Sequence, residues 1–157
     1  MKHFLVTVCL ASLLAAPAAM AAEDANEKAI KARRGAMQVR VFNAGPLFAM
    51  AKGEMAYDAE LASTLAKNLS LETQMDAGRM WPKGSDNANA AYKGKTRSLP
   101  EIWSTYPAVS DKGKAYKEAV TKLNASAGNG LDALKAAVGD LGKACKGCHD
   151  DFRAKDF

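Results

Sequence analysis

The residues with the clearest chemical meaning are Cys145, Cys148 and His149, close to the end of the chain. Two thiols three positions apart lie on one face of a helix, so each could form a thioether with one vinyl group of the same porphyrin. The histidine directly after them could then bind the iron of that porphyrin as its proximal ligand. This C-x-x-C-H spacing is typical of c-type haem attachment and predicts one covalently bound haem per chain.

Cysteine pairs of this spacing also occur in redox sites and zinc sites, which need a βαβ context or a second pair of ligands that this chain lacks. The other cysteine and histidine, Cys9 and His3, lie in an N-terminal segment that we expect to be removed. His149 is then the only histidine left, which excludes a bis-histidine iron, a histidine-based zinc site and a catalytic pair that uses histidine. A second protein ligand to the iron would be methionine or, less favourably, lysine.

The first residues have the pattern of a secretory signal peptide, with a basic start, an apolar stretch over residues 4–16 and a small-x-small cleavage site that ends at Ala21. We expect residues 1–21 to be removed and residues 22–157 to form one domain in the periplasm. The apolar stretch is too short for a bilayer core of ~30 Å, so no membrane insertion is expected.

Apolar residues spaced three and four apart predict helices along the rest of the chain. A first helix is expected from Glu23 to about Met50, kinked or restarted at Gly45-Pro46. A second helix is expected to begin with Asp58 as its N-cap. The apolar face of the first helix is predicted to contain Ile30, Met37, Val41, Ala44 and Phe48.

The second half of the chain predicts a long connection and two more helices. Residues 76–99 are rich in glycine, asparagine and lysine and are expected to connect the helices. Pro100 is expected to open a third helix that runs to about Ala125 and could bend at Pro107. After Gly130 a fourth helix carries the cysteines on its apolar stripe. We therefore predict an all-α fold, an antiparallel four-helix bundle with haem c near the C-terminal helix.

With these features, the chain resembles the cytochrome c-prime family, the class II c-type cytochromes, over essentially all of its mature length. Other c-type cytochromes carry the haem motif near their N-terminus, so its position on the last of four helices separates the classes. The resemblance implies that Cys145 and Cys148 form the thioethers and that His149 is the proximal ligand. The segments that carry it are residues 51–54, 57–58, 100–103, 136–139 and 145–153.

The resemblance also suggests roles for four arginines. Arg153 corresponds to the basic residue beside the proximal imidazole, although an arginine there could also cap the helix. Arg33, and less surely Arg34, matches a first-helix arginine near a haem propionate, and Arg97 lies in a segment that often approaches the propionates. Each could equally be a solvated cation, above all Arg34 and Arg97.

The resemblance places Met37 at the first-helix position that faces the iron, where relatives differ. A methionine that binds iron there gives a low-spin electron carrier of the cytochrome c-556 type. A methionine that does not bind leaves a five-coordinate iron in a crowded apolar pocket that admits small diatomic gases. Met37 could also be a plain core residue. We favour a five-coordinate cytochrome that binds nitric oxide and carbon monoxide and exchanges electrons, with the c-556 type as the alternative.

The remaining expectations concern partners and activity. The net charge of +5 comes from scattered basic residues with no run typical of nucleic-acid binding. The resemblance implies a homodimer packed through its first two helices, and a weakly basic surface could attract an unidentified periplasmic redox partner. We do not expect an enzyme, since peroxidase-like chemistry needs a distal acid–base group and no second histidine supplies one.

Overall fold

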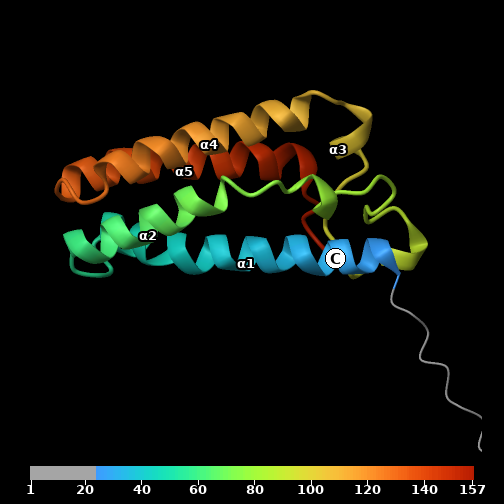
Figure 1. Ribbon diagram of the computed structural model, residues 1–157, viewed down its shortest axis with the longest axis horizontal. Helices are drawn as coiled ribbons and strands as arrows, with labels where there is room; N and C mark the ends of the chain where they lie inside the picture. Colours follow the sequence, from blue (N-terminus) through green and yellow to red (C-terminus); the bar gives the residue numbers. More distant parts are fainter. Residues whose placement is uncertain (1–23) are drawn as a thin grey trace, which may run out of the picture.

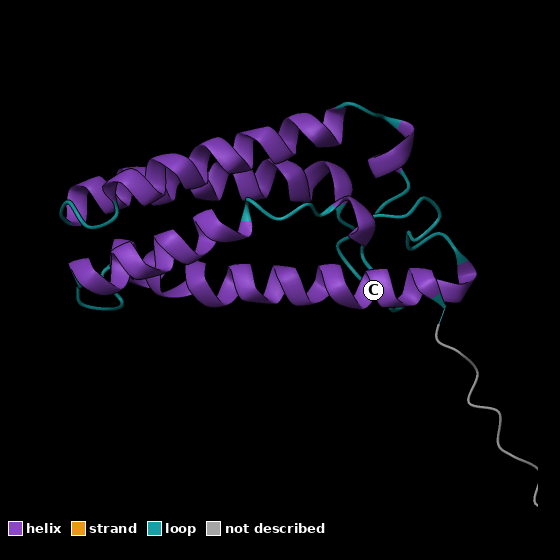
Figure 2. Ribbon diagram, viewed as in Figure 1, coloured by secondary structure: helices purple, strands orange, loops and turns teal. Residues whose placement is uncertain are grey.

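The computed structural model describes residues 24–157, and its regular structure is helical (Figure 2). The predicted signal peptide and the predicted helix start at Glu23 lie outside the described residues. Within them there is no strand, only an isolated antiparallel bridge between Ser98 and Arg153. The elements are α1 (Ala25–Lys52), α2 (Ala59–Glu72), the short 3-10 helices η1 (Gly78–Met80) and η2 (Ala90–Tyr92), α3 (Glu101–Ser104), α4 (Ala108–Ser126) and α5 (Leu131–Phe152).

Local sequence explains where the long helices begin and end. The side chain of Asp58 accepts a hydrogen bond from the backbone N–H of Leu61 at 2.9 Å, which confirms the predicted N-cap of α2. Gly53 ends α1 with a φ of 79°, in the left-handed region that favours glycine. Gly130, with a φ of 107°, reverses the chain between α4 and α5.

Four helices form the predicted bundle, in which α1 packs against α2, α2 against α4, α4 against α5 and α5 against α1 (Figure 1). The connection from α2 to α4, with α3, lies at the end of the bundle where α1 begins and α5 ends. None of the helices in the described part of the chain has the length and apolar character needed to cross a membrane. The core contains Leu47, Met50, Ala62, Leu65, Ala66, Leu69, Val120, Leu123, Ala127, Leu134, Ala137, Val138 and Leu141.

The sequence left a kink or a restart open at Gly45-Pro46, and the structure excludes the restart, because α1 continues through Pro46 to Lys52. Proline removes the N–H that would bond the carbonyl of Phe42, and this turn faces solvent, where water can replace the lost bond. Val41 is not a core residue, since 71% of its surface is exposed. An α-helix has 3.6 residues per turn, so two turns take slightly more than seven residues. Over the 28 residues of α1, apolar positions that repeat every seven residues therefore drift around the helix and away from the core.

The predicted third helix is two helices, α3 and α4, separated by Thr105 to Pro107. Pro107 therefore ends one helix and precedes the next, which is more than the bend expected from the sequence. A proline disfavours the helical conformation of the residue before it, and this explains the break. Pro100 precedes α3 directly, within one residue of its predicted place.

Candidate haem site

The cysteine motif lies on the last turns of α5, on the stripe that also packs into the core. The buried residues Leu134, Val138 and Leu141 are followed at the same spacing by Cys145 and Cys148. Cys145 packs against the core cluster, and both cysteines are half-buried and free of a disulfide. The helix therefore presents two thiols on one side, as thioether formation with one porphyrin requires.

Both thiols are held in the protonated form. Burial raises the pKa of Cys145, and the cation of Arg40 opposes this only in part. Burial also raises the pKa of Cys148, against the opposing charges of Lys112 and Arg40. A reactive redox pair has a lowered thiol pKa, so the structure disfavours a dithiol redox site.

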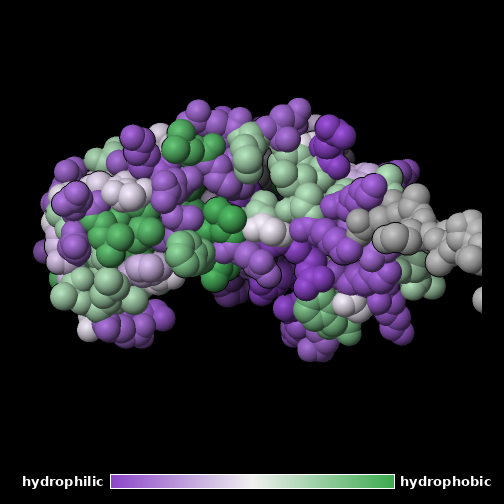
Figure 3. Space-filling model, turned by 60° about the horizontal axis from the view of Figure 1, so that its bottom comes forward, coloured by the Kyte–Doolittle hydropathy of each residue, from purple (hydrophilic) through white to green (hydrophobic). Residues whose placement is uncertain are grey.

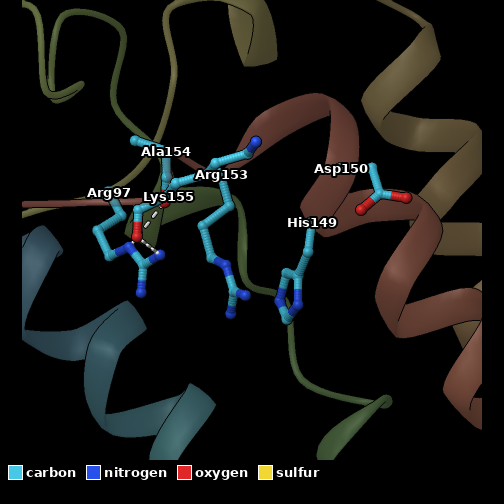
Figure 4. Close-up of a pocket in the computed structure, with 6 residues that line it drawn as sticks. All are labelled: Arg97, His149, Asp150, Arg153, Ala154 and Lys155. Atoms are coloured by element: carbon cyan, nitrogen blue, oxygen red, sulfur yellow. Dashed lines mark hydrogen bonds between the residues drawn. The ribbon is translucent and has the colours of Figure 1, made fainter.

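His149 faces a cavity of about 460 Å³ between the end of α5 and the connection (Figure 4). The side chains of Arg97 and Arg153 point toward the same space, and Asp150 lines it as well. Burial lowers the pKa of His149, and the charges of Arg153 and Arg97 lower it further. The imidazole is therefore neutral at neutral pH, which is the form that binds a metal ion.

The segment after α5, residues 153–157, is fixed beside this cavity by Arg97. The Nε of Arg97 donates to the carbonyl of Ala154 at 2.7 Å, and its Nη2 donates to the carbonyl of Lys155 (Figure 4). The backbone N–H of Ala154 donates to the carbonyl of Arg97 at 2.8 Å. The ring of Phe157 lies 5.6 Å from the guanidinium of Arg97 and 5.5 Å from that of Arg34, within cation–π range.

Arg33 is buried, with 3% of its surface exposed, and it binds the connection. Its Nη1 donates to the hydroxyl of Ser85 at 2.7 Å and to the carbonyl of Met80 at 3.2 Å. Its Nη2 donates to the hydroxyl of Thr96 at 2.8 Å and to the carbonyl of Ser85. Burial lowers the pKa of Arg33 to about 10. Arg33 thus anchors the connection to α1, and its propionate contact stays a prediction.

Arg34 is exposed and donates to the carbonyl of Lys95 at 3.1 Å. Of the four predicted arginines, only Arg97 and Arg153 line the cavity of His149. Arg33 and Arg34 instead bond to the connection, Arg33 at residues 80, 85 and 96 and Arg34 at residue 95. Arg34 also shares the ring of Phe157 with Arg97, which links it to the residues beside the cavity.

Met37 lies on α1 and is half-buried, as a residue at the edge of a cofactor pocket would be. Its sulfur is 3.6 Å from Nη1 of Arg40, one turn further along the helix. Of the other methionines in the described residues, Met50 is fully buried in the core, Met55 and Met75 are 40% and 50% exposed, and Met80 is half-buried in the connection. The distal role of Met37 stays a prediction.

The sequence analysis missed a charged cluster beside Met37. Arg40 donates from Nη2 to one carboxylate oxygen of Glu72 at 2.6 Å and from Nε to the other at 2.9 Å. The ring of Tyr116 lies 4.5 Å from the same guanidinium. The three-residue spacing from Met37 to Arg40 was the one signal available in the sequence. Glu72 and Tyr116 belong to other helices, and no local pattern links them to it.

The residues present fit a covalently bound haem. Two protonated thiols and one neutral imidazole lie on the last turns of α5, and a cavity opens beside the imidazole. Arg97 and Arg153 place positive charge at this cavity, where the propionates of a haem would be stabilised. The partly exposed stripe at Cys145 and Cys148 continues a buried helix face, and the apolar surface of a porphyrin would cover it.

Comparisons with known proteins agree with this fit. The sequence model of the family described as Cytochrome C' matches residues 28–153. Cytochrome c' of Cereibacter sphaeroides is 44% identical over 149 residues, which cover 94% of this chain and 97% of that protein.

Solved structures give the same result. Cytochrome c' from Rhodobacter sphaeroides matches with a TM-score of 0.80 and 41% identity, over 85% of this chain and 99% of that one. A nitric oxide complex of a mutant cytochrome c prime from Alcaligenes xylosoxidans matches with a TM-score of 0.72 and 30% identity, over 85% of this chain and 99% of that one.

Proposed function

This chain belongs to the cytochrome c′ family and carries haem c, and on that premise we propose that it is a periplasmic cytochrome whose five-coordinate iron binds nitric oxide and carbon monoxide and exchanges electrons. The observation that carries the proposal is the arrangement on α5, where a single neutral imidazole follows the two thiols and faces a cavity. The nitric oxide complex of a structural relative supports the gas-binding part.

In this proposal Cys145 and Cys148 form the thioethers and His149 binds the iron. When bound, the haem supplies the redox change and the site for the gas, and the protein orients the haem and controls access to it. Arg153 and Arg97 stabilise the propionates and keep His149 neutral through their charge. The protein acts as a carrier and gas binder rather than as an enzyme.

The contact made by the side chain of Met37 is an argument for a five-coordinate iron. Its sulfur contacts Nη1 of Arg40 at 3.6 Å, so the thioether is held toward the guanidinium by a weak N–H···S contact. Met37 then crowds the distal side without binding the iron, and small uncharged diatomics can enter. The alternative is a six-coordinate electron carrier of the c-556 type, favoured by the position of Met37 on the half-buried face of α1.

The cellular setting follows from the sequence. Residues 1–21 are proposed to be a signal peptide that is cleaved after Ala21, and residues 22–157 to be the mature periplasmic domain. An unidentified periplasmic redox partner would deliver or accept the electron.

We expect the mature protein to be a homodimer that packs through α1 and α2. Val41 and Phe42 on α1 are 71% and 77% exposed, and Val39 is 52% exposed. A hollow of about 390 Å³ lies over Met37, Gln38, Val41 and Phe42. Hydrophobic residues gather on the left half of the face shown in Figure 3. Exposed apolar patches of this kind are typical of protein interfaces.

The test of the proposed function is a gas titration of the purified haem protein. The ferrous protein should take up carbon monoxide and nitric oxide rapidly at micromolar concentration, followed by visible absorption, and Met37→Leu should bind both gases at similar rates. Slow uptake that becomes fast only in Met37→Leu would mean that Met37 occupies the sixth position, and the c-556 alternative would replace the proposal.

A further inference from the structure

The charged cluster next to Met37 consists of Arg40, Glu72 and Tyr116, and it holds its arginine by more contacts than a surface ion pair has. Glu72, at the end of α2, receives two parallel hydrogen bonds from the guanidinium of Arg40 on α1. The side chain of Glu72 is 8% exposed and that of Arg40 is 27% exposed. Tyr116 of α4 lies against the guanidinium and directs its hydroxyl to Glu72 at 3.5 Å. Three helices thus fix one arginine side chain in position.

Because these contacts fix the guanidinium of Arg40, they also determine which of its N–H donors remains available. Nε and Nη2 are occupied by the carboxylate, as in other bidentate arginine–carboxylate pairs. The remaining group, Nη1, is directed to the sulfur of Met37 at 3.6 Å. Nη1 carries two N–H groups and a thioether accepts only weakly, so one N–H can keep the contact with Met37 while the other bonds a second acceptor. Arg40 therefore presents an oriented and nearly free N–H group at the residue proposed to cover the iron.

The cluster also lies close to the residues that hold the haem. Tyr116 and Cys145 both pack against the same core cluster. The charge of Arg40 opposes the effect of burial on the pKa of both Cys145 and Cys148. Because the proposed function places Met37 over the iron, it also places Nη1 of Arg40 on the same side of the haem as Met37.

We propose that Arg40 donates a hydrogen bond from Nη1 to the outer oxygen of a diatomic ligand on the haem iron, and that it thereby selects ligands by how well this oxygen accepts a hydrogen bond. The proposal rests on the proposed function, because it needs an iron that accepts a gas. Nitric oxide gains from the contact when it is bent and its oxygen carries negative charge, and carbon monoxide gains less. Glu72 and Tyr116 are positioning residues that act through Arg40.

Glu72 also determines which ligands are not favoured. The carboxylate neutralises the guanidinium, so the cluster adds no net charge to the distal side. Free anions are therefore not attracted as they would be by a lone arginine, whereas a neutral diatomic meets a donor once it is bound. Crowding by Met37 and donation by Arg40 would then act together, the first by size and the second by polarity.

The test is the C–O stretching frequency of the ferrous carbon monoxide complex, measured by infrared spectroscopy. A donor at the oxygen increases electron donation from iron into the ligand and lowers this frequency, so Arg40→Leu should raise it. The ratio of nitric oxide to carbon monoxide affinity should fall roughly tenfold or more in the same variant, the size expected for a hydrogen bond from a charged group. Lys117→Leu, which removes an exposed cation on α4, should change neither quantity.

Two further variants keep the test informative if Arg40→Leu folds poorly. Replacing both partners, Arg40→Leu with Glu72→Leu, leaves no unpaired charge and should fold while showing the same raised frequency. Glu72→Gln keeps the donor but loosens it, and should broaden the C–O band. A frequency that stays unchanged in the folded double variant would overturn the proposal.

The same measurement in a Met37→Ala background separates this inference from the proposed function. If Met37 occupies the sixth position, the wild type resists carbon monoxide and the proposed function fails, but Met37→Ala opens the site. An Arg40-dependent frequency in that background would still support donation by Arg40. Equal frequencies with and without Arg40 in that background would contradict it.

Discussion

The proposed proximal and distal sides of the haem site both contain arginines, but these arginines bond to different partners. On the proximal side, Arg97 donates to the backbone carbonyls of residues 154 and 155. Within the described residues its hydrogen bonds go to carbonyls and not to a carboxylate, so its charge is not neutralised by a bonded partner. On the distal side, Arg40 is neutralised by the carboxylate of Glu72. Positive charge on the proximal side suits anionic propionates and a neutral imidazole. A neutral but oriented donor on the distal side suits uncharged gases.

The two sides also differ in how they are assembled. His149 lies in the last turn of α5 and residues 153–157 follow the helix directly, so most of the proximal side comes from one stretch of chain. The distal cluster needs α1, α2 and α4 to meet. Mutations should therefore act locally on the proximal side and through the packing of the bundle on the distal side.

The largest effect is expected on the proximal side, from Cys145→Ser combined with Cys148→Ser. Without thiols no thioether can form, so haem stain after denaturing electrophoresis should disappear completely. Gly147→Ala lies within the same motif, and its added methyl group would meet only the end of Lys112 at 3.7 Å, an ordinary contact. This control should keep its haem. A positive stain in the double variant would contradict the assignment of the thioethers.

The next largest effect is expected from Glu72→Gln on the distal side. The change leaves the guanidinium of Arg40 without its carboxylate, and we expect the free energy of unfolding to fall by about 2 kcal/mol, between the values for exposed and buried pairs. Asp111→Asn makes the same chemical change in a pair with Lys114 whose side chains are 63% and 69% exposed. It should cost less than about 0.5 kcal/mol. Urea unfolding measures both changes. Equal losses of unfolding free energy would show that the Arg40–Glu72 pair stabilises the protein no more than an exposed ion pair does.

Arg97→Ala should have a smaller and more local effect. It removes two hydrogen bonds to the segment 153–157, worth about 1 kcal/mol together after solvent replaces them. Hydrogen exchange should become faster at the N–H of Ala154, which donates to the carbonyl of residue 97. Exchange in the middle of α4 should not change. Faster exchange across the whole bundle would mean that the proximal side is not a local unit.

The smallest effect on folding is expected from Phe42→Ser on the outer face of α1. Phe42 is 77% exposed, so the free energy of unfolding within one chain should change by less than about 0.5 kcal/mol. The dimer should nevertheless weaken, seen as a lower sedimentation coefficient at the same concentration. Tyr106→Ser, at a 74% exposed site between α3 and α4, is the control for loss of exposed apolar surface. An unchanged dimer would place the interface elsewhere.

The placement of the C-x-x-C-H motif on one stripe of a helix could be predicted because its signal lies within a short segment. The spacing of Cys145, Cys148 and His149 depends only on helix periodicity, and α5 confirms that these residues share the end of its apolar stripe. The bundle could be predicted for the same reason, since each long helix carries its own apolar face and α1 and α2 also carry a capping aspartate. Asp58 and Gly130 are examples of signals that act within a few residues.

The distal side could not be predicted because its contacts join residues far apart in the chain. Arg40 and Glu72 are 32 positions apart, and Arg33 contacts Thr96 across 63 positions. A sequence pattern shows that an arginine is on a helix but not which carboxylate or carbonyl it meets. Val41 was misplaced for a related reason, since the face of a long helix that is buried depends on its neighbours.

The most direct test of the account is the electron paramagnetic resonance spectrum of the ferric haem protein at neutral pH, recorded for the wild type and Met37→Leu. A five-coordinate iron held by His149 predicts a high-spin signal in both proteins, with only small differences between them. A low-spin signal in the wild type that becomes high-spin in Met37→Leu would contradict the account, because the methionine would then be a ligand and the distal side would not be open to gases.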